Sequence, residues 1–136
     1  MIHPWRILRS RPHLVLAFAD LPGDLLGTWR PGVVTLTTHL LQVERRCVLM
    51  HELVHDERGM AHPALEAKDE AAVEREVARR LIRLADLERA LRWSLDLHVV
   101  ADELWVTVDV LEARLRALHP AERARLLEVV SDVHAA

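Results

Sequence analysis

The hydrophobic pattern of the chain changes from short apolar runs near the N-terminus to helical periodicity beyond about residue 38. The runs at 14–18, 26–29 and 33–37 are bounded by proline or glycine, with Pro31-Gly32 between the last two. Short apolar segments between such residues are typical of strands, and two of them around a Pro-Gly turn are typical of a hairpin. We therefore predict a small N-terminal sheet, while the segment Trp5–Leu8 fits a short helix or a strand equally well.

Two longer segments have the spacing of helices. The first begins between Thr38 and Gln42 and ends at Gly59, because glycine readily takes the conformation that stops a helix. The second covers about Glu66 to Leu84, and its apolar stripe consists of Val73, Val77, Leu81 and Leu84. Three shorter helices and a last one follow, with predicted N-caps at Asp86, Asp96 and Thr107 and with Pro120 in the first helical position.

These elements predict an α+β fold. A small antiparallel or mixed N-terminal sheet packs on a central helix, which a second helix and a C-terminal helical bundle follow. A chain of 136 residues is most simply one domain. Within it we expect the sheet at 1–38, the two central helices at 39–84 and a helical subdomain at 85–136.

Composition excludes several function classes. The formal charge of −3 gives no basic footprint for nucleic acid, so no direct nucleic-acid binding is expected. A single cysteine excludes an internal disulfide and fits a reducing compartment. No apolar run approaches the length of a membrane span, and no signal-peptide pattern opens the chain. We expect a soluble, cytoplasmic protein, and the sequence specifies no oligomeric state.

The strongest chemical signal is His51-Glu52-Leu53-Val54-His55, within the first long helix. Residues four apart stack on one helical face, so both histidines can ligate one zinc ion while Glu52 deprotonates a zinc-bound water. The frequencies of His and Glu in this chain give about one accidental match in twenty such chains. The alternative is a pair of histidines on the surface of an amphipathic helix. The apolar run before His51 instead indicates a buried helix, in which the histidine and glutamate side chains need polar or charged partners.

A catalytic zinc usually takes a third protein ligand. On the second helix, Glu70 falls near the centre of the apolar stripe and Glu74 near its edge, and a buried acid there needs a positive partner. Glu70 is the predicted ligand, with Glu74 supporting a ligand from behind or replacing Glu70; pairing of Glu70 with an arginine remains an alternative. Glu66 needs no metal to explain it, because it lies at the helix start, where the helix dipole favours a negative charge. Cys47 lies on the His51 face, but ordinary core packing explains it better than ligation.

With Arg45-Arg46-Cys47 before the motif and Glu70-Ala-Ala-Val73-Glu74 after it, the chain from about Leu26 onwards resembles the ImmA/IrrE-type metallopeptidases, which are compact gluzincin-like enzymes. The resemblance implies His51, His55 and Glu70 as ligands and Glu52 as general base. It places Glu74 where the family has Asn or Asp. It also implies a protein substrate, namely a helix-turn-helix repressor of a phage, a mobile element or a stress regulon.

Several interpretations stay open. A metallopeptidase commonly stabilises the developing oxyanion with a Tyr or His side chain. Because the chain has no Tyr, His62 is the candidate for this role. The alternative is that His62 is a loop residue with no catalytic role. Zinc is the expected metal, and ligand type alone does not exclude manganese. A strand at the sheet edge can pair with an extended substrate or with nothing. The rival function is a non-catalytic, metal-bound regulatory module that binds a repressor or toxin, and a structural zinc protein is a weaker third.

The C-terminal third carries weaker signals. The segment around Trp105–Thr107 has the look of a helix-turn-helix, but its second helix begins Val108-Asp109-Val110, which phosphate would repel. A core-forming helical hairpin is the better interpretation. Four arginines interleave with glutamates and predict a solvated face; they are Arg114, Arg116, Arg123 and Arg125.

Overall fold

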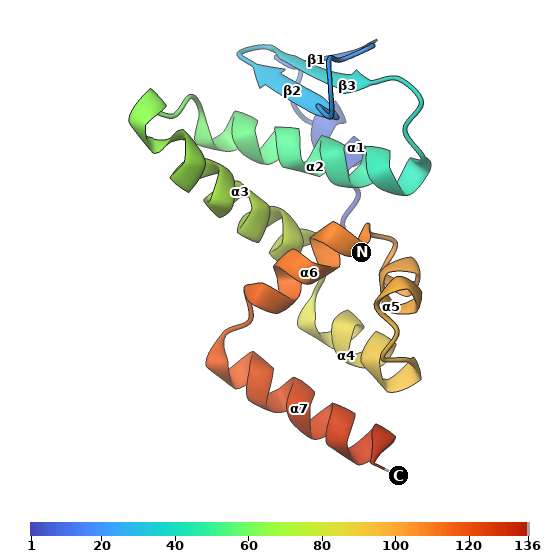
Figure 1. The fold of residues 1–136 in the computed structure, drawn as a ribbon. Helices are drawn as coiled ribbons and strands as arrows, with labels where there is room; N and C mark the ends of the chain where they lie inside the picture. The colour runs from blue at the N-terminus through green and yellow to red at the C-terminus, as the bar shows by residue number, and fades with distance from the viewer. Residues whose placement is uncertain (136) are drawn as a thin grey trace. The chain divides into compact units, whose positions relative to one another are not determined.

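The computed structural model describes residues 1–135, which form a small mixed sheet and seven α-helices (Figure 1). The α+β class predicted from the sequence is confirmed. Contacts divide the described chain into two compact units, one ending at Val77 and one beginning at Ala78, so the division falls within a helix. Among the described residues, no helix has both the length and the apolar character needed to cross a membrane.

The sheet of the first unit contains β1 (Val15–Ala19), β2 (Gly27–Arg30) and β3 (Val33–Thr37) in the order β1-β3-β2. β3 pairs in parallel with β1 and antiparallel with β2, which confirms the predicted hairpin. Gly32 takes a φ of 88° in its turn, a conformation that a residue with a Cβ rarely adopts. Val34 and Leu36 of the central strand are fully buried, and they supply the sheet's contribution to the core.

Helix α1 (Pro4–Arg9), which settles the ambiguous N-terminal segment, packs against α2 (Gln42–Arg58). α2 begins and ends where the sequence predicted, and Gly59 terminates it with a φ of 75°. Its apolar residues Leu49, Met50 and Leu53 are fully buried. α2 lies between the sheet on one side and the start of α3 (Glu66–Leu81) on the other (Figure 1). A short 3-10 helix, Pro63–Leu65, precedes α3.

β2 lies along α2, and two contacts fix it there. At Gly27 an added Cβ would stand only 2.6 Å from Cγ1 of Val48 and 3.2 Å from Oε1 of Glu52, so the two backbones approach closely. Further along, the indole Nε1 of Trp29 donates to Oδ1 of Asp56 at 3.1 Å. Val48, Glu52 and Asp56 follow one another at four-residue spacing, so they form a single line along the helix. This line is the face that α2 presents to β2.

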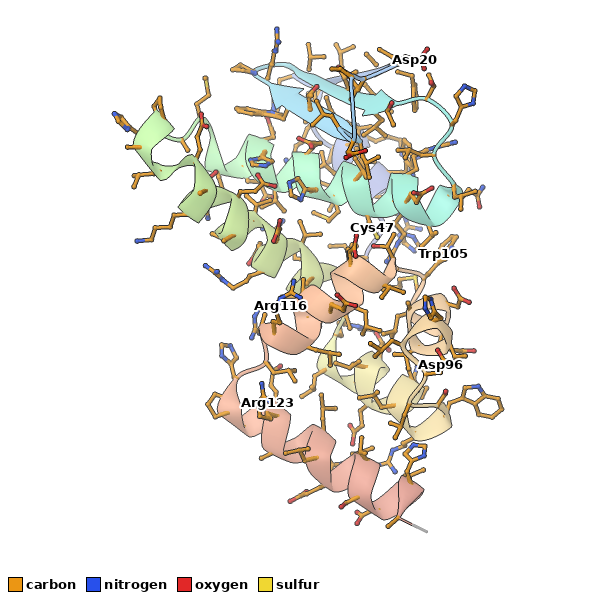
Figure 2. The ribbon with its side chains drawn as sticks, in the orientation of Figure 1. Asp20, Cys47, Asp96, Trp105, Arg116 and Arg123 are labelled. Atoms are coloured by element: carbon orange, nitrogen blue, oxygen red, sulfur yellow. The ribbon has the colours of Figure 1, made fainter. Side chains whose placement is uncertain are left out.

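The second unit contains the end of α3 and four helices: α4 (Leu84–Trp93), α5 (Leu97–Leu104), α6 (Val108–Arg116) and α7 (Pro120–His134). Asp96 caps α5 by accepting the N–H of His98, and Thr107 caps α6 by accepting that of Val110, as predicted. Figure 2 labels Asp96 and Trp105 at the two ends of α5.

Two expectations for the second unit are wrong. Asp86 is not the N-cap of α4: the N-cap is Arg83, three residues earlier, and Asp86 in the first turn accepts from Arg83 at 3.0 Å. Arg114 is not on a solvated face but is only 2% exposed. Its Nε donates to the carbonyl of Ile82 at 2.9 Å and its Nη2 meets Glu122 at 3.0 Å, so the buried charge is compensated.

Candidate metal centre

Three side chains of the first unit converge where α3 starts beside the end of α2. Nε2 of His51 lies 2.6 Å from Oε1 of Glu70, and Nε2 of His55 lies 2.9 Å from Oε2 of the same carboxylate. The two Nε2 atoms are 3.2 Å apart, and the imidazole rings meet edge to face with centroids 4.9 Å apart. The predicted ligands are thus brought together, although nothing in the sequence alone could fix the distance between the two helices.

The donor set suits a zinc ion. Two ligands at zinc's usual nitrogen distance in a tetrahedral site stand about 3.3 Å apart. The two imidazole nitrogens, 3.2 Å apart, match this spacing, whereas Glu70 lies within hydrogen-bond distance of both, at 2.6 and 2.9 Å, and would draw back slightly to admit an ion. His51, His55 and Glu70 are the group of described residues whose ligand atoms, one from each, all lie within 4.8 Å of one another. Each is half-buried, so the group is partly open to solvent.

The electrostatics of His51 favour a metal ligand. Burial lowers the pKa of His51, and the nearby Glu70 carboxylate offsets this only in part. A neutral imidazole is the form that ligates a metal, because the cation has no free lone pair. The lowered pKa therefore favours the neutral form of His51, which can bind a metal ion, at neutral pH.

Glu52 lies on a different face of α2 from the two histidines. Adjacent residues on a helix point about 100° apart, and Glu52 accordingly faces β2, where its side chain lies beside Gly27. It is only 6% exposed. Burial raises its pKa to about 7, and the negative charge of Glu70 adds to the effect. A carboxylate with a pKa near neutrality can both accept and return a proton under ordinary conditions.

The Asp56 side chain joins α2 to two other parts of the first unit, β2 and the loop before β1. It accepts from Trp29 on β2, from Arg11 at 3.1 Å, and lies 3.0 Å from Nε2 of His13. Burial raises the pKa of Asp56, but the hydrogen bonds from His13, Trp29 and Arg11 outweigh it and the net pKa is lowered. The next residue along from His55 therefore anchors the sheet to the helix that carries the ligands.

The other sequence candidates lie outside the converging group. Glu74 and Glu66 are exposed on α3. His62 is exposed on the loop before α3, where its Nδ1 accepts the backbone N–H of Ala64 at 3.1 Å, so its role at an oxyanion stays a prediction. Cys47 is 5% exposed, as expected of core packing, and Figure 2 labels it in the N-terminal half of α2.

Sequence reasoning missed two residues of this region. Gly27 gave no signal, because its value lies in the nearness of α2, which only the fold establishes. Asp69 was also missed, although it lies four residues before the buried Val73 and thus beside the apolar stripe of α3. Comparisons of the chain with protein-family models, with curated proteins and with solved structures found no match.

Proposed function

We propose that this chain is a zinc-dependent endopeptidase. One observation carries the proposal: the imidazoles of His51 and His55 and the carboxylate of Glu70 meet at one point, while the next residue after His51 is a buried glutamate. Two histidines and a glutamate are a donor set used by catalytic zinc, which keeps a further position open. A structural zinc site would leave Glu52 without a task.

Each of these residues has a separate role in the proposed peptide hydrolysis. His51, His55 and Glu70 would hold the ion, which would supply Lewis acidity toward the peptide carbonyl and the attacking water. Glu52 takes a proton from the water as its oxygen bonds to the carbonyl carbon. It then gives the proton to the amine nitrogen as the C–N bond breaks.

The substrate is proposed to be a protein segment in extended conformation. β2 lies at an edge of the sheet and contacts the helix at Glu52, so a peptide paired with β2 would run past the general base. The likeness of the motif to the ImmA/IrrE-type metallopeptidases supports a helix-turn-helix repressor as the protein that is cut. The single cysteine supports action in the reducing cytoplasm.

A second candidate is a module that holds the metal and binds a repressor or toxin without cutting it. Two observations favour it: the chain contains no tyrosine, and His62 is exposed and engaged with Ala64. An oxyanion donor is worth about 10²-fold or more in rate. A chain that lacks one would be a slow enzyme or none.

Zinc content and a single substitution separate these candidates. We expect about one zinc per wild-type chain by mass spectrometry of the metal, and loss of that zinc in Glu70→Gln but not in Glu66→Gln, a matched exposed acid on α3. Glu52→Gln should keep the zinc but lose cleavage of a proteome-derived peptide library by about 10²-fold or more. Equal cleavage by Glu52→Gln would refute the mechanism, and zinc binding without cleavage in the wild type would favour the module.

A further inference from the structure

The far side of the His55 ring faces an acid that the proposed mechanism has not used. Because Nε2 of His55 points at Glu70 and His51, Nδ1 points the other way, and Oδ2 of Asp69 lies 3.9 Å from it. The Asp69 side chain is 15% exposed, against 44% for the neighbouring Glu70. Asp69 is therefore the better buried of the two acids at the start of α3.

Asp69 is itself held in place from α2. Nε and Nη2 of Arg58 both lie 2.7 Å from Oδ1 of Asp69, and Arg58 is one turn beyond His55 on the same helix. The other carboxylate oxygen is left toward His55. The chain Arg58–Asp69–His55 thus starts and ends on α2 and passes through α3.

An acid in this place has a definite effect on a ligating histidine. An imidazole that binds a metal through Nε2 carries its proton on Nδ1, and a carboxylate near Nδ1 favours that tautomer, fixes the ring and makes Nε2 a stronger donor. A separation of 3.9 Å is longer than a hydrogen bond. The contact in the structure is therefore electrostatic, and a modest effect on metal affinity is expected.

We propose that Asp69 is a positioning residue that orients His55 for metal binding and that Arg58 holds Asp69 in place. The inference rests on the proposed metal centre. It gives Asp69 the supporting role that the sequence predicted for Glu74, which is exposed and acts by its charge on His51. The support for His55 comes from the residue immediately before the glutamate ligand instead of from one turn beyond it.

The test is the zinc dissociation constant of the full chain, measured by competition with a chelator of known affinity. Asp69→Asn keeps the shape but removes the charge, and it should weaken zinc binding about tenfold. Glu66→Gln removes one charge from an exposed position of the same helix, and it should leave the affinity within about twofold. Arg58→Ala should fall between these two, and Asp69→Glu, which restores the charge, should recover most of the loss.

A second readout separates positioning from folding. In the zinc-loaded wild type, the Nδ1 proton of His55 should give a slowly exchanging NMR signal, and Asp69→Asn should speed its exchange while the urea midpoint of the metal-free chain is unchanged. If Asp69→Asn fails to fold, the zinc affinities of Asp69→Glu and Arg58→Ala decide between the two roles. Equal affinity in Asp69→Asn and Glu66→Gln would overturn this inference and leave the metal centre standing, whereas a wild type that binds no zinc would overturn the proposed function itself.

Discussion

Replacing Gly27 with alanine places a methyl group between β2 and α2. Its Cβ would stand 2.6 Å from Cγ1 of Val48, and 3.2 and 3.3 Å from Oε1 and Cγ of Glu52. Carbon atoms in contact are normally about 3.5–4.0 Å apart, so something must move. Val48 cannot easily turn aside, because a β-branched side chain in a helix has one strongly preferred rotamer. The strand itself should shift away from the helix.

Two effects of opposite sign decide the magnitude. Gly27 is not among the glycines with positive φ, so alanine suits its backbone, and the stiffer unfolded chain favours folding by about 0.4–1 kcal/mol. Overpacking a filled site costs about 1–3 kcal/mol. The steric cost wins, and we expect Gly27→Ala to lower the free energy of unfolding by about 1–2 kcal/mol. Urea denaturation followed by circular dichroism measures it.

A double-mutant cycle shows whether the clash with Val48 is the cause. Val48→Ala removes the methyl group that the new Cβ would meet, so Gly27→Ala should cost at least about 1 kcal/mol less in the Val48→Ala background than in the wild type. Zinc affinity should change little, because the ligands face α3, while any hydrolysis should fall as Glu52 is displaced. Additive costs would refute the clash with Val48, and a Gly27→Ala chain as stable as the wild type would refute the close approach of β2 to α2.

Two further predictions concern buried hydrogen bonds. Trp29→Phe removes the donor to Asp56 and should destabilise the chain by about 1–2 kcal/mol, whereas Trp93→Phe, at a residue 75% exposed, should change the free energy of unfolding by less than about 0.5 kcal/mol. For Glu122, the hydrogen bond from Arg114 lowers the pKa from 4.5 to about 2, with the backbone N–H of His119 adding to it. A lowered folded-state pKa stabilises above the ordinary value, so this contribution should be full above pH 4.5 and disappear as pH falls toward 2. Glu122→Gln should cost about 2–3 kcal/mol at pH 7 and almost nothing near pH 2, while Glu128→Gln, at a side chain 71% exposed, should have little effect at either pH.

Local chemistry explains what the sequence predicted well. The hairpin follows from Pro31-Gly32 between two β-rich runs, and the end of α2 follows from Gly59; both glycines take positive φ in the structure. The caps Asp96 and Thr107 bond to backbone N–H groups two and three residues further on. Each of these features is decided by residues within one turn of one another, so the sequence contains the whole cause.

The error at Arg114 comes from long-range contacts. Arg114 has the sequence surroundings of a solvated arginine, but the carbonyl of Ile82 and the carboxylate of Glu122 meet it in the fold. A side chain that can satisfy its charge inside is free to be buried, and no local pattern reports where such partners will lie. Asp86 was misplaced for a smaller reason. An acid is favourable both at the N-cap and within the first turn, so its presence fixes the start of a helix only to within a turn.

The candidate site shows within α2 alone which features the sequence can predict and which depend on long-range contacts. Periodicity gives the direction of each side chain around the axis of α2, which is why His51 and His55 could be paired from the sequence. It does not say what stands opposite each face. That Gly27 lies against Glu52 and that Asp69 lies behind His55 depend on how β2 and α3 dock on α2. The three candidate ligands can therefore be predicted from the sequence, whereas Gly27 beside Glu52 and Asp69 beside His55 cannot, because they belong to neighbouring elements. Substitutions at these two positions test whether the surroundings of the motif support the proposed zinc site.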